Sequence, residues 1–222
     1  MLDKFSGWLI GRSGTNPGPM EARVADEPMP EVDARTRDKD RVPPRQVRTE
    51  KWPVLHYGDV PRVDIKTWKF FIRGHVEHPF ELTYDELKAL PHQETLCDIH
   101  CVTRWTKFDT VWEGVPFKAI VELARPRPSV KFVVTHGANG YSANVPFSVA
   151  NDDDVLLAYR YEGKPLEPIH GGPMRMFVPK RYFWKSTKWC NGIEFLDKDS
   201  PGFWEVRGYN NDADPWKEER YW

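Results

Sequence analysis

From Lys51 to the end of the chain, short apolar runs are separated by glycine and proline, which limits the elements that can form. In "TWKFFIRG", Trp68, Phe70 and Ile72 fall on one side of an alternating pattern, which predicts a half-buried strand. The runs "VKFVV", "VLLAYRYEG", "MRMFVP" and "GIEFL" predict further strands. Because predicted strands outnumber helices and do not alternate regularly with them, we expect an α+β fold of mixed β-sheets with short helices. The pattern disfavours a doubly wound nucleotide-binding fold.

Two short helices are predicted between these strands. In "LTYDELKALP", Thr83 and Glu86 have the spacing of a capping box, and Pro91 ends the helix. In "GVPFKAIVELARP", Pro116 is expected at the first helical position, and the helix should end before Pro126.

The N-terminal part of the chain has a different composition. Prolines and mixed charges dominate stretches such as "TRDKDRVPPRQVRTEK", and large apolar residues are rare there. Such a segment buries too little apolar surface to offset the entropy lost on ordering. We therefore expect residues 1–50 to be disordered or extended along the surface, and residues 51–222 to form one domain.

Charge and hydropathy exclude several classes of protein. Lys+Arg (32) nearly balances Asp+Glu (33), whereas a nucleic-acid-binding protein normally carries a basic excess. No apolar run approaches the ~20 residues needed to span a bilayer. The start of the chain lacks the apolar core of a secretory signal and has no twin arginine. We expect a cytoplasmic protein with no nucleic-acid or membrane partner.

The stretch "PHQETLCDIHCVTRW" brings Cys97, His100, Cys101 and Arg104 close together in sequence. A structural zinc site needs a second ligand pair, and none follows. A redox pair normally has two intervening residues rather than three. His100 is poorly placed to activate the adjacent Cys101, since neighbouring side chains rarely point at each other. The remaining alternative is that the thiols only pack in the core.

A second cluster lies in "EGKPLEPIHGGPMRMFVPKRYFWKSTKW". It combines basic and hydroxyl side chains with a Gly-Gly-Pro turn, namely His170, Arg175, Lys185, Ser186 and Lys188. Paired charge, hydrogen-bond donors and close main-chain approach are what a phosphate-bearing ligand needs. Without a ligand, the same residues would make an ordinary solvated face.

Four stretches taken together resemble a known family. They are "PVLHYGDVPRVD", "DIHCVTRWTKFDTVWEGVPF", "LLAYRYEGKPLEPIHGGPMRMFVPKRYFWKSTKWCNGIEF" and "PGFWEVRGYNNDADPWKEERYW". Over roughly residues 51 to 222 the chain resembles the molybdopterin-binding domain of sulfite oxidase-like oxidoreductases, in their short cytoplasmic single-domain branch. The resemblance implies that domain's fold and a molybdopterin cofactor carrying molybdenum.

The resemblance also implies roles for individual residues. Cys101 would be the metal ligand, and a thiolate is the soft ligand that such a centre prefers. Arg104 would lower the cost of ionising that thiol and stabilise negative charge on the substrate or metal oxo group. The cofactor itself would be held by His56, Thr135, His136, His170, Arg175, Ser186, Thr187 and Lys188. Cys97, His100 and Cys190 are expected only to pack, as are Trp105, Trp112 and Trp189.

The implied function is two-electron oxygen-atom transfer, either sulfite-like oxidation or reduction of an S- or N-oxide. Its partners would be a small oxo donor or acceptor and an external electron-transfer partner, because the chain shows no haem, flavin or iron–sulfur motif. The arginine cluster of sulfite-oxidising members is missing near Cys101, which puts sulfite itself in doubt. Two alternatives stay open: a non-catalytic carrier of the cofactor, and a metal-free thiol redox enzyme using Cys97 and Cys101.

Overall fold

The structure is a computed structural model that describes residues 41–222. Most of the predicted N-terminal segment, residues 1–40, lies outside the described residues. Its last part lies along the domain: β1 (Val47–Arg48) pairs in parallel with β5 (Trp105–Pro116), and the side chain of Gln46 is buried. Among the described helices, none is both long and apolar enough to cross a membrane.

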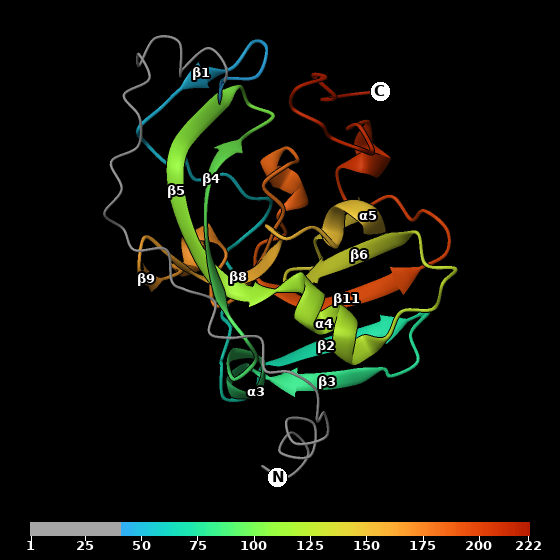
Figure 1. The fold of residues 1–222 in the computed structure, drawn as a ribbon. Helices are drawn as coiled ribbons and strands as arrows, with labels where there is room; N and C mark the ends of the chain where they lie inside the picture. Colours follow the sequence, from blue (N-terminus) through green and yellow to red (C-terminus); the bar gives the residue numbers. More distant parts are fainter. Residues whose placement is uncertain (1–40) are drawn as a thin grey trace, which may run out of the picture. The chain divides into compact units, whose positions relative to one another are not determined.

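Within the described residues the strands form two sheets (Figure 1). The first has the order β1-β5-β8-β10, with β4 paired to β5 and β9 paired to β8. Its other strands are β4 (Gln93–His100), β8 (Leu156–Tyr161), β9 (Lys164–Pro165) and β10 (Arg175–Phe177). Apart from the β1–β5 pair, its neighbours are antiparallel. The long β4–β5 hairpin ends in a turn at Cys101–Arg104, and this turn brings the predicted metal ligand to the end of the sheet.

The second sheet has the order β3-β2-β11-β6-β7. Its strands are β2 (Lys69–Gly74), β3 (Phe80–Thr83), β6 (Phe132–Gly137), β7 (Ser142–Pro146) and β11 (Cys190–Leu196). The β2–β11 pair is parallel and the others are antiparallel. Both sheets are therefore mixed, and the predicted α+β class is confirmed.

The helices are short, as predicted. Those that lie entirely within the described residues are α3 (Tyr84–Lys88), α4 (Phe117–Ala124), α5 (Phe147–Ala150) and three 3₁₀ turns, η1 (Pro168–His170), η2 (Phe183–Lys185) and η3 (Glu205–Arg207). The capping box of Thr83 and Glu86 is present. Helix α4 begins one residue later than predicted, because Pro116 still pairs with Leu156 as the last residue of β5.

The main core lies between the second sheet, α4 and β8. Phe117 of α4 packs its ring against Phe195 of β11, and Leu157 of β8 belongs to the same cluster. A smaller cluster surrounds Trp112, which is fully buried and stacks on Phe177 of β10. The second cluster holds the first sheet against the segments that carry the candidate site.

Candidate functional site

A cavity of about 260 Å³ opens where five segments distant in sequence meet. The segments are residues 52–57, the β4–β5 turn, the β6–β7 loop, the stretch from β10 to β11, and the C-terminal part beyond residue 200. The lining consists of Trp52, Pro53, Leu55, His56, Tyr57, Cys101, Val102, Thr103, Trp105, Asn139, Tyr141, Arg175, Phe183, Trp184, Ser186, Lys188, Trp189, Trp204 and Tyr209. Both sequence clusters therefore contribute to one cavity.

The backbone of Cys101 is held tightly at the end of β4. Its N–H donates to the carbonyl of Trp105 at 2.9 Å, and its carbonyl accepts from Gln46 Nε2 at 3.0 Å. The hydroxyl of Thr103 donates to Cys101 Sγ at 3.2 Å. Burial raises the pKa of this thiol, while Thr103 and the positive charge of Arg175 act in the opposite direction. The thiol therefore needs a cation or a metal beside it to ionise, which suits a ligand position.

Arg175 on β10 is the central cation of the cavity. Its guanidinium donates to the carbonyls of Ser186 at 3.0 Å and His170 at 2.8 Å, and it stacks over the ring of Phe183 at 3.8 Å. Burial lowers its pKa to about 9, and it forms no ion pair with any of residues 41–222. Because a guanidinium has five N–H donors, it keeps donors available for an anion.

Two further basic groups lie next to Arg175. Lys188 donates to the carbonyl of Ile169 at 2.8 Å, and burial, followed by repulsion from Arg175, lowers its pKa to about 7. The rings of His170 and Trp52 stack with their centroids 3.7 Å apart. Burial, together with the positive charges of Lys188 and Arg175, lowers the pKa of His170 to about 4. The Nδ1 atom of His170 is buried without a hydrogen-bond partner.

These three groups make a site for an anion. Arg175 lowers the pKa of Lys188, both cations lower the pKa of His170, and no carboxylate of the described residues pairs with Arg175 or Lys188. A phosphate placed among them would supply the missing negative charge and accept the unused hydrogen bonds. The donor set, with a thiol on the same cavity, fits a phosphate-bearing cofactor that carries a metal for Cys101.

The remaining predicted residues are distributed differently. Ser186 lines the cavity, and His56 lies on its exposed rim with Nδ1 2.8 Å from the carbonyl of Gly58. Thr135 and Thr187 bond to each other at 2.6 Å, buried outside the cavity lining.

Two predicted residues lie away from the cavity. The side chain of Arg104 is exposed and is not part of the lining. His136 pairs instead with Glu194 of β11 at 3.4 Å on the second sheet. Neither side chain therefore contacts the cavity in this arrangement.

Residues that sequence reasoning did not assign make up most of the cavity wall. Seven of these unassigned residues are aromatic, namely Trp52, Tyr57, Tyr141, Phe183, Trp184, Trp204 and Tyr209. Trp204 and Tyr209 lie in "PGFWEVRGYNN", where the clustering of aromatic residues and the family resemblance of the stretch were the available signals.

Cys97 and Cys101 belong to separate parts of the structure. Cys97 packs in the Trp112 cluster with its sulfur 3.9 Å from Thr110 Oγ1, whereas Cys101 packs with Val102 and Tyr182. Four residues of extended strand span roughly 13 Å, well beyond the reach of a disulfide. Among residues 41–222, no three His, Cys, Asp or Glu side chains gather to hold a metal. Neither a thiol pair nor a zinc site made of protein ligands alone therefore finds support in this geometry.

The lowered pKa of Lys188 leads to a pH dependence. Its pKa falls from 10.5 to about 7 in the folded protein, so the unfolded chain binds the proton more readily and folding stability decreases as pH falls through that window. A bound anion favours the charged ammonium. We therefore expect the affinity of cofactor-free protein for sulfate to fall up to about tenfold per pH unit above pH 7.

Titration calorimetry with sulfate at about pH 6.5, 7.5 and 8.5 measures this effect. The Lys188→Met variant is the control, and its affinity should vary much less over the same range. Equal pH slopes for the two proteins would contradict the assignment of this titration to Lys188.

Comparisons with known proteins agree with this geometry. A family model described as "Oxidoreductase molybdopterin binding domain" matches residues 57–204. The chain is 43% identical over 191 residues to an uncharacterized oxidoreductase, YuiH, of Bacillus subtilis, covering 84% of this chain and 96% of that protein. It is 28% identical over 163 residues to the catalytic subunit MsrP of a protein-methionine-sulfoxide reductase from Campylobacter jejuni, covering 63% of this chain and 52% of the relative.

A solved structure shares the fold. It is the sulfane dehydrogenase SoxCD from Paracoccus pantotrophus, which matches with a TM-score of 0.61 at 20% identity. The match covers 91% of this chain and 66% of the solved chain. The fold expected from the sequence is thus found in a solved protein that extends beyond the matched region.

Proposed function

This chain belongs to the family of oxidoreductase molybdopterin binding domains, and on that premise we propose that it reduces a neutral S-oxide to a thioether. The chain is an oxidoreductase, and its cofactor is molybdopterin carrying molybdenum. Electrons would come from an external partner, and the oxygen atom would leave as water. The name of the Campylobacter jejuni relative, a methionine-sulfoxide reductase, supports this reaction class.

The observation that carries the proposal is the chemistry of the cavity wall. The basic side chains of the lining are His56, Arg175 and Lys188, and Arg175 and Lys188 belong to the anion site that the cofactor would occupy. The rest of the wall is mainly aromatic and aliphatic. A charged oxyanion such as sulfite or nitrate would lose its hydration there without gaining a cation of its own, whereas a neutral S-oxide has one polar oxygen and an apolar remainder.

In this proposal the residues of the chain bind and orient the reactants. When bound, the molybdenum pterin supplies the two-electron change and the oxygen-atom transfer. Cys101 is the thiolate ligand of the metal, and Thr103 donates a hydrogen bond to its sulfur. Arg175, Lys188 and Ser186 hold the anionic end of the cofactor. The aromatic wall excludes water and receives the apolar part of the substrate.

The two protons needed to release the oxygen atom as water would come from solvent. Burial raises the pKa of Tyr141 well above its ordinary value, and its hydroxyl donates to the carbonyl of Trp184 at 2.7 Å. The pKa of His170 is lowered to about 4, so this side chain is neutral at pH 7. At neutral pH, therefore, neither the hydroxyl of Tyr141 nor the imidazole of His170 readily donates a proton.

A protein that only carries the cofactor would need the anion site but not the aromatic wall of the cavity. The present cavity has both, with Cys101 on its lining, which favours an enzyme over a carrier. The thiol alternative requires Cys97 to approach Cys101, and the extended strand between them separates the two sulfurs.

Steady-state kinetics with the molybdenum-loaded enzyme tests the proposal. Reduced viologen dye would report reduction of dimethyl sulfoxide, methyl phenyl sulfoxide and nitrate, and ferricyanide would report oxidation of sulfite. We expect kcat/KM for methyl phenyl sulfoxide to exceed that for nitrate or sulfite by roughly 100-fold or more, because the anions lack a free cation in the cavity. A higher kcat/KM for either anion would contradict the proposed substrate class.

A further inference from the structure

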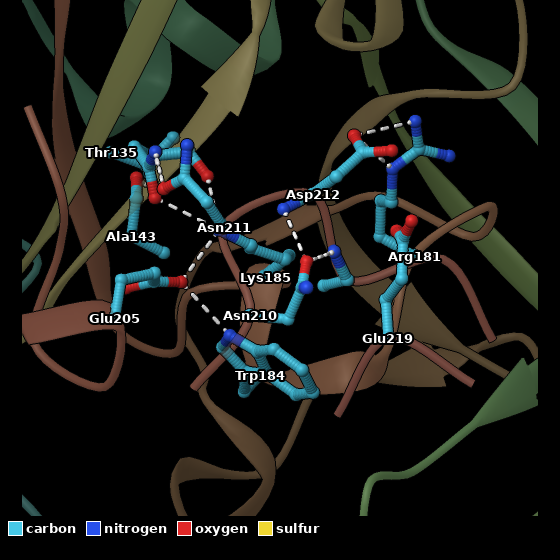
Figure 2. A network of polar contacts seen from close by, with 12 residues as sticks. Thr135, Ala143, Arg181, Trp184, Lys185, Glu205, Asn210, Asn211, Asp212 and Glu219 are labelled. Carbon is cyan, nitrogen blue, oxygen red and sulfur yellow. Dashed lines mark hydrogen bonds and ion pairs between the residues drawn. The ribbon is translucent and has the colours of Figure 1, made fainter. Parts of the chain in front are cut away.

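A fully buried ion pair between η2 and η3 contacts Trp184, a residue of the cavity lining (Figure 2). Lys185 Nζ of η2 and Glu205 Oε1 of η3 are 2.6 Å apart, and both side chains are 0% exposed. The ammonium also donates to Asn144, to the main-chain carbonyl at 2.9 Å and to Oδ1 at 2.8 Å. All three protons of Lys185 are therefore used, and the residue is not available to the cofactor site in which its sequence position had placed it.

The same carboxylate oxygen holds a residue of the cavity wall. Glu205 Oε1 accepts from the indole Nε1 of Trp184 at 2.9 Å, as Figure 2 shows, and the ring of Trp184 lines the cavity. The other oxygen, Oε2, is buried and has no hydrogen-bond partner among residues 41–222. Within this part of the chain, the side chain of Glu205 therefore binds only Lys185 and the indole of Trp184.

Glu205 also lies between two other residues of the wall. Trp204 precedes η3 and Tyr209 follows it, and both line the cavity. Tyr209 contacts Trp184 edge to face at 5.1 Å and stacks with Trp204 at 4.9 Å. One carboxylate oxygen therefore joins the two segments that carry three neighbouring aromatic side chains of the wall.

Stability alone does not explain a charged pair at this place. Burying two charges costs desolvation energy, and an apolar pair of the same volume is often equally stabilising or more so. Packing against Tyr182 and Tyr209 already restrains the ring of Trp184, and an acceptor at a defined point adds a direction for its indole N–H that an apolar contact cannot supply. What the pair adds is a single orientation of Trp184 relative to Trp204 and Tyr209.

We propose that Glu205, held by Lys185, is a positioning residue that fixes the orientation of the aromatic side chains of the cavity wall that receive the substrate. The inference rests on the proposed function, because it assigns the wall to the substrate and not to the cofactor. It differs from the roles of Arg175 and Lys188, which contact the anion site directly. Removing the pair should therefore change substrate use and leave cofactor content intact.

Two variants distinguish a positioning role of Glu205 from a stabilising one, because one removes a single charge of the pair and the other removes both. Glu205→Leu leaves Lys185 charged and unpaired, and should lower the melting temperature by roughly 10 °C. The double variant Lys185→Met/Glu205→Leu removes both charges at similar volume, and should regain most of that loss. Both variants lack the acceptor for the indole.

The decisive readouts are measured on the molybdenum-loaded double variant. We expect near-wild-type molybdenum and pterin content, faster hydrogen–deuterium exchange in residues 202–210, and kcat/KM for methyl phenyl sulfoxide roughly 10- to 100-fold lower, mainly through KM. A double variant that regains stability together with wild-type exchange and kcat/KM would overturn the proposal and leave the pair a structural element.

Trp184→Phe provides an independent test that leaves the ion pair in place. It removes only the indole N–H and part of the ring, so it should reproduce the faster exchange in residues 202–210 without the large loss of melting temperature. Unchanged exchange in this variant would also overturn the proposal. Because exchange does not require turnover, it decides the role of Glu205 even if the wild type reduces no S-oxide, an outcome that would contradict the proposed function alone.

Discussion

Replacing Cys101 with serine is expected to lower turnover of every oxo substrate by more than about 100-fold while the pterin stays bound. Mutating even the hydrogen-bonding partners of a metal ligand typically costs 10- to 100-fold, and this change removes the ligand itself. A serine hydroxyl is a harder donor than a thiolate and does not ionise readily at neutral pH. The anion site of Arg175 and Lys188 is untouched, so the pterin should remain.

The measurement combines three quantities on the same preparation. These are molybdenum per chain by mass spectrometry, fluorescence of the released oxidised pterin, and kcat/KM with the preferred substrate. Cys97→Ser is the matched control, because Cys97 packs in the Trp112 cluster away from the cavity, and it should keep kcat/KM within a factor of about three. Full turnover by Cys101→Ser would remove Cys101 from the role of ligand.

Replacing Arg175 with methionine is expected to reduce pterin and molybdenum content to about one tenth or less. The buried guanidinium has no carboxylate partner among the described residues, so its charge is available to the phosphate of the cofactor. Loss of one charge-assisted, two-pronged contact costs more than the loss of a neutral hydrogen bond. Arg175→Lys keeps a charge without the planar fork and should retain an intermediate amount of cofactor.

The control for this effect is Arg104, an arginine that lies close to Cys101 in sequence. Arg104→Met should retain the cofactor, since its side chain is exposed and lies outside the cavity lining. The melting temperature of cofactor-free Arg175→Met should stay within about 5 °C of cofactor-free wild type. The reason is that relief from burying an unpaired charge offsets the lost hydrogen bonds to the carbonyls of Ser186, His170 and Phe183. Wild-type cofactor content in Arg175→Met would contradict the anion site.

Local patterns determined much of the fold. The alternation in "TWKFFIRG" became β2, and the capping box of Thr83 and Glu86 begins α3 as predicted. The strands expected in "VKFVV", "MRMFVP" and "GIEFL" are β6, β10 and β11. These features depend on backbone preferences and on periodic burial within a few residues, and both can be read from a single stretch of sequence.

The anion site was predictable for a related reason. Arg175, Ser186 and Lys188 lie within one stretch joined by a short strand, so local chain geometry keeps them close to one another. Residue type then indicated the ligand, because paired positive charge, a hydroxyl and a Gly-Gly-Pro turn together are what a phosphate-bearing ligand needs. The soft thiol of Cys101 could be named from "DIHCVTRW", although its place on the same cavity could not.

By itself, then, the sequence determined the strands, the capped helix and which side chains carry the chemistry of a metal and a phosphate. Only the tertiary structure decided which of them meet. Lys185 stands beside Ser186 in sequence, yet it faces Glu205 and not the cavity. Arg104 follows Cys101 by three residues and points into solvent, while Trp204 and Tyr209 come from a distant segment to form the wall. The physical reason is that direction and partner depend on how two sheets and the C-terminal segment pack, and contacts between distant segments leave no periodic trace in either one.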